Sequence, residues 1–521
     1  MKKSLLSRRA AIKTLGAYTT FAGLSPKVKA EVEAEKPPNI IYFFSDTHRW
    51  SALPFTQAKG LCTPNMESLK DQSLWMSHCF TNAPVCSPFR GILLSGRWPW
   101  QQGLVGNHMT LHSRLDVPRS RTKSSNLGGL FKAAGYETAY FGKSHWGGLD
   151  VRPFGFDKSF VADQNQHDRL RRCEDGSALP DWRRRLDVNN SRPIIQEAIQ
   201  HLTQWSSQPE ENRPPLCMLI SINPPHGFMR DAPSRMKALY PDIGKLPFAW
   251  YDTRRDFLDH QGYHAHISAT DEDLGLLLAA MNKIDIADDT IFVYTSDHGG
   301  MGGLHGMPYG SKHRPEDEAT RVPFFIRWPG KISPGGVSDR LFSTIDHLPT
   351  LASLAGLDSL YKERPGYEAN ICRDYLSECP GLDFAQHFLD RNLKKGPDPE
   401  AIFIESNTPE HRSINRPPFR AVVTKDYTYS LKSGEQYVLY ARNSEDPYRN
   451  ILAQVSPAEI DYLYQMTLEQ WLKYEAPYVE DWIYNTSREN IIAWTRAFGF
   501  RSRRRMEDRD LAYSLVFNPY L

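Results

Sequence analysis

The stretch that decides the fold is Asn39-Ile40-Ile41-Tyr42-Phe43-Phe44-Ser45-Asp46, an apolar run that closes on a serine and an aspartate. A strand with one face in water alternates apolar and polar residues, but here consecutive positions are apolar and serve both faces. The run therefore predicts a strand that is buried on both faces of a parallel sheet.

Three later runs repeat this pattern, and each also ends in polar residues. They are residues 138–141, 216–222 and 290–294, followed by Gly142-Lys143-Ser144-His145, by Asn223-Pro224-Pro225-His226 and by Ser296-Asp297-His298. Segments with helical character stand between them, at residues 63–74, 125–134, 194–205 and 263–284, and residues 324–328 predict a further strand. This alternation predicts an α/β domain with a mostly parallel sheet between helices. Because ligands bind beyond the carboxyl ends of such strands, the polar clusters should meet in one crevice.

Residues 85–97 predict a short helix that begins at a cysteine. Pro88 suits the first helical turn, where its missing N–H costs nothing, and Gly96 suits the helix end. Cys86 then lies at the helix N-terminus, where free backbone N–H groups and the helix dipole favour an anion. Arg90 follows one turn later.

From residue 401 the pattern changes to short strands at residues 419–424, 427–431 and 437–440, followed by a helix at residues 457–474. This order predicts a small antiparallel sheet with one helix. Two polar segments carry no periodic pattern. Residues 163–185 predict a surface insertion, and the arginines of residues 501–505 predict a solvated tail.

The composition is that of an ordinary globular chain. Its 521 residues are 40% hydrophobic and 24% charged, which is enough for one large core and a smaller domain. With 63 basic and 61 acidic residues the net charge is +2, so bulk charge gives no reason to expect a nucleic-acid partner. Any selectivity for anions must be local.

The N-terminus resembles a twin-arginine export signal. Arg8 and Arg9 precede a modest apolar run at residues 14–24, and Val28-Lys29-Ala30 offers a cleavage site after Ala30. The apolar run is too short for a permanent membrane anchor. We therefore expect export machinery as a partner, no integral membrane segment in the mature form, and a periplasmic or secreted location.

The chemistry-bearing residues, taken in order, resemble the active-site motifs of the type I sulfatases, which belong to the alkaline phosphatase superfamily. The matching positions are Asp46, Cys86 to Arg90, Lys143 to His145, His226, Asp297-His298 and Lys312, with the flanking phrases at residues 317–323 and 327–330. The resemblance implies an alkaline-phosphatase-like α/β/α sandwich with a smaller C-terminal domain. The expected organisation is a signal peptide at residues 1–30, a catalytic domain at 38–395, a small α+β subdomain at 400–485 and a tail at 486–521.

By the same resemblance, Cys86 is oxidised by a maturation enzyme to formylglycine, the catalytic residue. Its hydrated aldehyde offers two hydroxyls, one to attack sulfur and one to lose its proton and eliminate the sulfate. The implied metal ligands are Asp46, Cys86, Asp297 and His298. The implied metal is Ca²⁺, with Mg²⁺ or Mn²⁺ as alternatives. Of the seven cysteines, six then remain, and Cys372 and Cys379 are near enough in sequence to bridge, although two thiols are the expected state.

The remaining roles also follow from the resemblance. Arg90 would hold the formylglycine hydroxyl, and Lys143 and Lys312 would neutralise the sulfate oxygens. His145 would be the base, and His226, with Lys312, the acid that protonates the departing alcohol. His305, Asn107 and His108 are further candidates for the substrate side. The implied substrate is a sulfated carbohydrate, either a polysaccharide or its oligosaccharides.

Two positions depart from the family pattern. Thr47 stands where a second aspartate is usual, which leaves two carboxylates for the metal and predicts weaker binding or a replacement water. Phe89 stands where serine or alanine is common, but the minimal Cys-x-Pro-x-Arg pattern remains. Two alternatives stay open from sequence: a phosphonate monoester or phosphodiester hydrolase of the same superfamily, and a non-catalytic sulfated-glycan binder with unmodified Cys86.

Overall fold

The computed structural model describes residues 36–102, 104–107, 126–161, 190–226, 229, 232–241, 254–307, 309–357, 376, 378–406, 419–432 and 435–474. All of them except Lys36 belong to one unit, Pro37–Leu521. The predicted export signal, the insertion at residues 163–185, the arginine-rich tail, Cys173, Cys372 and His108 lie outside the described residues. None of the described helices combines the length and apolar character that crossing a membrane requires.

The core of the protein is an eight-stranded sheet in the order β5-β4-β6-β1-β7-β8-β2-β9. Its strands are β1 (Asn39–Asp46), β2 (Leu74–Met76), β4 (Glu137–Gly142), β5 (Lys158–Phe160), β6 (Leu216–Pro225), β7 (Thr290–Ser296), β8 (Phe324–Arg327) and β9 (Val337–Ser338). Among the described strands of this sheet, β8 alone runs antiparallel to its neighbours. The predicted mostly parallel sheet is confirmed, and the four strands whose ends carry the polar clusters are adjacent in it.

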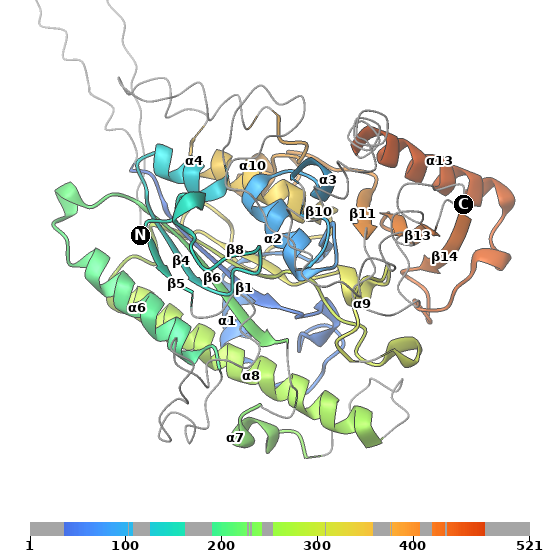
Figure 1. Cartoon of the computed structure of the whole chain (residues 1–521), viewed down its shortest axis with the longest axis horizontal. Helices are drawn as coiled ribbons and strands as arrows, with labels where there is room; N and C mark the ends of the chain where they lie inside the picture. The colour runs from blue at the N-terminus through green and yellow to red at the C-terminus, as the bar shows by residue number, and fades with distance from the viewer. Residues whose placement is uncertain are drawn as a thin grey trace, which may run out of the picture. The chain divides into compact units, whose positions relative to one another are not determined.

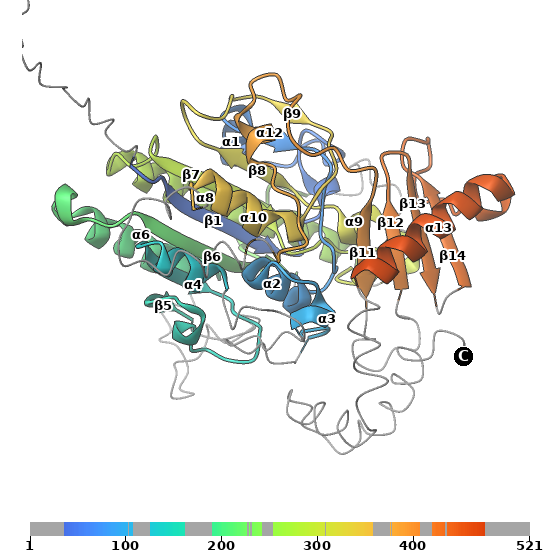
Figure 2. The same cartoon turned by 90° about the horizontal axis from the view of Figure 1, so that it is seen from above.

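The alternate side chains of β1 face two separate hydrophobic layers, as expected for a strand that is covered on both sides. Tyr42 and Phe44 belong to one buried cluster, and Ile41 and Phe43 to the other. The first layer contains α2 (Cys86–Ser95), α4 (Leu127–Ala133) and α10 (Thr344–Leu354), and the second contains α1 (Pro64–Asp71), α6 (Arg192–Ser206) and α8 (Arg254–Lys283). Figures 1 and 2 show these helices on opposite faces of the sheet.

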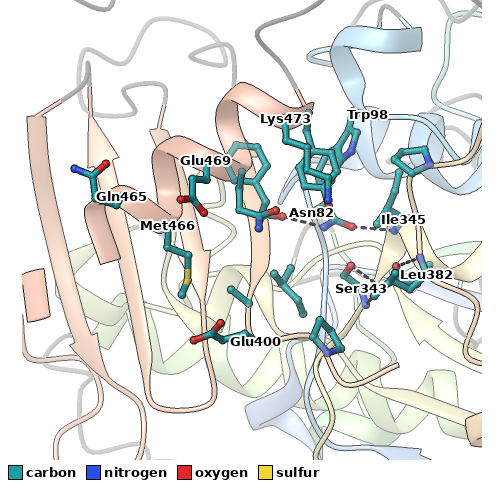
Figure 3. A pocket seen from close by; sticks show the side chains of 18 of the residues that line it. Asn82, Trp98, Ser343, Ile345, Leu382, Glu400, Gln465, Met466, Glu469 and Lys473 are labelled. Atoms are coloured by element: carbon teal, nitrogen blue, oxygen red, sulfur yellow. Dashed lines mark hydrogen bonds between the residues drawn. The ribbon is translucent and has the colours of Figure 1, made fainter. Parts of the chain in front are cut away.

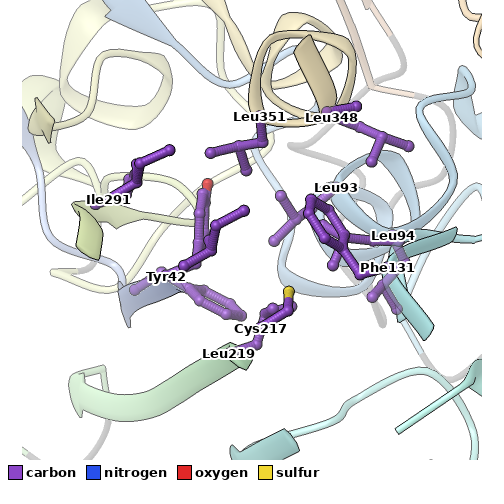
Figure 4. Packing of buried hydrophobic residues seen from close by; sticks show 14 of the residues in the cluster. Tyr42, Leu93, Leu94, Phe131, Cys217, Leu219, Ile291, Leu348 and Leu351 are labelled. Carbon is purple, nitrogen blue, oxygen red and sulfur yellow. The ribbon is translucent and has the colours of Figure 1, made fainter. Parts of the chain in front are cut away.

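Helix α2 lies inside the first layer, and all of its residues are buried. Figure 4 shows Leu93 and Leu94 between the sheet and α10. The helix ends as predicted, because Gly96 adopts a left-handed conformation with φ 58° and its N–H bonds the carbonyl of Ile92. Phe89 is fully buried against the ring of Phe44, with 5.8 Å between ring centroids, so this departure from the family pattern lies in the core.

A second sheet, of four antiparallel strands, follows in the chain. It consists of β11 (Ile402–Ser406), β12 (Phe419–Val423), β13 (Tyr427–Lys432) and β14 (Glu435–Ala441), and α13 (Pro457–Tyr474) packs on it. Asn82 links this sheet to α10, because its side chain donates to the carbonyl of Phe403 and accepts from the N–H of Ile345. Figure 3 shows this junction and the cavity of about 370 Å³ beside it. The predicted small antiparallel sheet is confirmed.

Shorter elements complete the described residues. They are β3 (Cys79–Phe80) and β10 (Phe342–Ser343), which pair with each other, the helices α3 (Pro99–Gln102), α7 (Ser234–Lys237), α9 (Asp317–Thr320) and α12 (Ala385–Leu389), and the 3₁₀ turns at Trp50–Ala52, Arg152–Phe154, Glu210–Asn212, Leu304–Gly306 and Leu452–Gln454. One boundary prediction is wrong: the helix expected at residues 63–74 ends at Asp71, and Leu74 instead opens β2 opposite Ile326 of β8. Pairing with a strand far along the chain overrides the local pattern there.

Candidate active site

The carboxyl ends of β1, β4, β6 and β7 bring the predicted site residues together. Asp46 ends β1, and Asp297 directly follows β7, whose Ser296 is in register with Ser45. On the other side of β1, the backbone N–H of His226 bonds the carbonyl of Asp46. The polar clusters at the strand ends therefore meet around Asp46, as the sequence predicts.

Two buried carboxylates form the centre of this site. Asp297 accepts from the backbone N–H groups of Thr47 and His298 at 3.1 and 2.8 Å. Asp46 accepts from the hydroxyl of Thr47 at 2.9 Å. Thr47 thus supports both carboxylates, and it does so from a left-handed backbone conformation with φ 67°.

Arg90 and Lys143 neutralise these carboxylates. Arg90 Nη2 lies 3.3 Å from an oxygen of Asp46 and 3.3 Å from one of Asp297, and Lys143 Nζ lies 2.6 Å from Asp46. Burial opposes the ionisation of Asp46, but the charge of Lys143 and other neighbours outweighs it and holds the pKa of this carboxyl well below its ordinary value. Arg90 is therefore placed to orient both carboxylates.

Cys86 lies against the same cluster, at the N-terminus of α2. Its Sγ accepts a hydrogen bond from Lys312 Nζ at 2.8 Å and lies 3.2 Å from His298 Nε2. His298 Nδ1 donates a hydrogen bond to the carbonyl of Gly299 across 2.6 Å. In the neutral ring, Nε2 is then the unprotonated nitrogen, and it faces the cluster as an acceptor. Burial, then Lys312, lowers the pKa of His298 to about 3, which keeps the ring neutral.

These groups fit a divalent cation. Asp46, Cys86, Asp297 and His298 each offer a ligand atom, and the four atoms lie within 4.8 Å of one another. Burial and then the charge of Asp46 raise the pKa of Asp297 well above its ordinary value, because two carboxylates share one buried site. A cation held between them would favour the ionised form of both. Two carboxylates and a neutral imidazole are ligands that Ca²⁺, Mg²⁺ or Mn²⁺ accept.

His145 and His226 border this cluster. His145 is 5% exposed, and its carbonyl accepts from the hydroxyl of Ser87 in α2. Burial and then Lys143 lower the pKa of His145 well below its ordinary value. His226 follows β6, and its carbonyl accepts from the side chain of Asn223. His226 thus follows β6, which is adjacent to β1, and His145 follows β4, which is the next strand beyond β6.

Sequence reasoning missed several residues that hold the site together. Asn223 accepts from Lys143 Nζ at 3.1 Å, and Ser221 accepts from Arg90 Nη1. Their signal was available, because both residues lie at the polar end of the strand that leads to His226. Tyr263 donates to the carbonyl of Thr47 at 2.7 Å from α8, and no local pattern marks it.

The structure places Asn107 and His305, two of the candidates for the substrate side, in different regions. Asn107 accepts from the backbone N–H of Ser87 at 3.0 Å and thereby caps the start of α2. His305 is 36% exposed and stacks on Tyr440 of β14, with 6.2 Å between ring centroids. Asn107 is therefore next to Cys86, whereas His305 faces the C-terminal sheet.

Comparison with known proteins points to one family. The model of the Sulfatase family matches residues 38–357 of this chain. An ulvan-active sulfatase from Formosa agariphila is 29% identical over 474 residues, which cover 86% of this chain and 84% of that protein.

Two solved structures share the fold. One comes from work on the metabolism of multiple glycosaminoglycans by Bacteroides thetaiotaomicron, with a TM-score of 0.66, 22% identity and coverage of 86% of this chain and 99% of that chain. The other is a protein in complex with its substrate D-glucosamine-2-N,6-O-disulfate, with a TM-score of 0.65, 20% identity and coverage of 85% and 99%. They confirm the alkaline-phosphatase-like sandwich. Since the family model matches more than half of the 521 residues, the chain belongs to the sulfatase family and is a sulfuric-ester hydrolase.

Proposed function

We propose that this sulfatase removes sulfate from a sulfated carbohydrate, a polysaccharide or its oligosaccharides. The observation that carries the proposal is the convergence of two carboxylates, Lys143 and Lys312 on Cys86 at the ends of neighbouring strands. A sulfate ester is an anion, and fixed positive groups around its sulfur lower the cost of bringing a nucleophile close. The carbohydrate is supported by the relative that acts on ulvan and by the neighbour solved with a sulfated glucosamine.

Cys86 is the site at which a maturation enzyme forms formylglycine. Burial, followed by the charge of Asp46, raises the pKa of the Cys86 thiol to about 12, so an unmodified thiol is a weak nucleophile at neutral pH. The hydrated aldehyde of formylglycine supplies a hydroxyl nucleophile at this position. Lys312 Nζ donates a hydrogen bond to Sγ in the structure. It is therefore placed to bind the formylglycine side chain at the same position.

Asp46, Asp297, His298 and the group at position 86 would hold one divalent cation, which we assign as Ca²⁺ with Mg²⁺ or Mn²⁺ as alternatives. Such a cation supplies positive charge for the nucleophile and for a sulfate oxygen. Arg90 keeps the two carboxylates oriented toward this position.

The other side chains neutralise charge and move protons. Lys143 and Lys312 bind sulfate oxygens. His145 is the base, since its lowered pKa leaves the ring neutral and able to accept a proton at neutral pH. His226, together with Lys312, protonates the departing alcohol.

Export and domain organisation complete the proposal. Residues 1–30 direct the chain to the export machinery, and the mature enzyme acts in the periplasm or outside the cell. The catalytic domain occupies residues 38–395, the small subdomain 400–485 and the tail 486–521. The family match at residues 38–357 and the separate β11–β14 sheet support this division.

The test is sulfate release from a panel of defined sulfated oligosaccharides, with protein made in a host that forms formylglycine. We expect release by the wild type, none by Cys86→Ala, and unchanged release by Cys62→Ala, which alters an exposed cysteine. Parallel assays on aryl sulfate and aryl phosphonate esters separate the related hydrolase, because higher efficiency on the phosphonate would contradict the proposal. Mass spectrometry of the peptide that contains Cys86 separates the non-catalytic binder, which would keep the thiol.

A further inference from the structure

A second polar cavity, of about 230 Å³, lies where α9 and the start of η1 (Trp50–Ala52) meet the C-terminal sheet. Figure 2 shows α9 beside the strands of that sheet. The cavity is lined in part by Trp50, His78, Asp317, Arg321 and Arg442. None of these residues has a part in the chemistry proposed above.

Two buried arginines lie side by side at this cavity. The guanidinium of Arg321 stands 3.7 Å from the ring centroid of Trp50, and that of Arg442 stands 4.6 Å from that of Phe80. Both also contact one carboxylate, Asp317, at 3.4 and 3.1 Å. Each guanidinium thus lies near an aromatic ring, and the two share Asp317 as an ion-pair partner.

The guanidinium of Arg442 has unused donors. Its side chain is 4% exposed. Nη2 lies at ion-pair distance from Asp317, but none of the three nitrogens is in hydrogen-bond geometry with any residue that the structure describes. Arg321, by contrast, donates from Nε and Nη2 to the carbonyl of Ser77 at 2.9 and 2.6 Å. Because a buried donor without a hydrogen bond costs free energy, Arg442 favours an acceptor in this cavity.

Two of the three carboxylates that line the cavity are paired with other arginines. Its acidic lining residues are Glu316, Asp317 and Glu318. Glu316 pairs with Arg314, and Glu318 pairs with Arg49 at 3.3 Å. Among the lining carboxylates, Asp317 therefore remains as the ion-pair partner of both Arg321 and Arg442, and Asp426 adds a more distant negative charge near Arg442. In agreement, burial and then Arg321 and Arg442 lower the pKa of His78 to about 3.

We propose that this cavity is an anion-binding site in which Arg442, with Arg321 beside it, holds one small oxyanion, a sulfate or a carboxylate. The volume is below that of a pocket for a drug-sized ligand and suits a single charged group. The group comes either from free sulfate or from a charged substituent of a sugar chain. The proposal goes beyond the catalytic function and does not depend on turnover.

The test measures equilibrium binding of radiolabelled inorganic sulfate to the full chain. It uses Cys86→Ala as the background, so that no turnover occurs. Adding Arg442→Gln should remove one bound sulfate per chain. Adding Arg152→Gln should remove none, because Arg152 is an exposed arginine paired with Asp150. Equal sulfate binding by the background protein and the Arg442→Gln protein would overturn the proposal.

Asp317→Asn gives a second test with the opposite sign, which does not require the Arg442 variant to fold. Loss of the shared counter-charge should tighten sulfate binding about threefold or more. Unchanged or weaker binding would contradict the proposal. Competition then identifies the source of the group: displacement of the Arg442-dependent sulfate by a sulfated oligosaccharide, but not by its neutral parent, assigns the site to the sugar chain, and failure to displace assigns it to the free ion.

Discussion

Lys312 donates a hydrogen bond to the thiol of Cys86 across 2.8 Å, although 226 positions separate the two residues in the chain. The same ammonium group lies 3.5 Å from Nε2 of His298. The buried ammonium group of Lys312 therefore contacts the residue that is proposed to become the nucleophile. It also lies next to His298, one of the candidate metal ligands.

Replacing Lys312 by methionine should lower kcat on an aryl sulfate by about 10²- to 10³-fold, because the variant loses a fixed charge that acts on the reacting group. Steady-state kinetics measure this change. Lys331→Met is the matched control, since Lys331 is exposed and lies beside Trp328. A Lys312→Met enzyme with kcat near that of the wild type would exclude this role.

Thr47→Asp should strengthen metal binding, because it adds a third carboxylate beside Asp46 and Asp297. The backbone of Thr47, with φ 67°, also suits aspartate better than a β-branched residue. We expect retention of Ca²⁺ against a chelator to rise about tenfold or more, measured by metal analysis after dialysis. Thr47→Asn has nearly the same shape without the charge and should show no such gain. Equal retention in the Asp and Asn variants would argue against a metal site at this position.

Phe89→Ala should destabilise the protein by about 3 to 5 kcal/mol, because it removes a fully buried ring that packs on Phe44. Urea unfolding measures the loss. Leu472→Ala is the control, since Leu472 is 63% exposed and its loss should change the free energy of unfolding by less than about 0.5 kcal/mol. Equal stabilities for the two variants would mean that Phe89 contributes nothing to the core.

Asp346 should lower the free energy of unfolding as the pH rises, which is opposite to the effect of a carboxyl whose pKa is lowered in the folded state. Burial raises the pKa of this carboxyl to about 6, although it accepts from Ser343 and from the N–H of Leu382. Since the folded pKa lies above the unfolded value of about 3.9, the folded state binds the extra proton between these values. The stabilisation that comes from protonated Asp346 is complete below about pH 4 and is lost as the pH rises through about 6.

The predicted loss is at most about 3 kcal/mol in the free energy of unfolding. Asp346→Asn removes the proton-binding group and should flatten this part of the curve. Urea unfolding at about pH 4 and about pH 7 in both proteins measures the difference. The same slope in wild type and variant would show that Asp346 does not titrate in this range.

Much of the fold was predictable because a strand that is buried on both faces has a simple local signature. The runs that became β1, β4, β6 and β7 contain few polar side chains, so their burial could be read directly from the sequence. Cys86, Asp46 and Asp297 were likewise found from short motifs at strand or helix ends.

The sequence by itself determined which side chains stand at the carboxyl ends of the strands, because that depends on local periodicity and on the polar residues that stop each run. Only the tertiary structure decided which of them touch: Arg90 on both carboxylates, Lys312 on Cys86, and Tyr263 on the carbonyl of Thr47. Those contacts depend on strand order and on helix packing between segments up to 226 positions apart, and no local pattern encodes either.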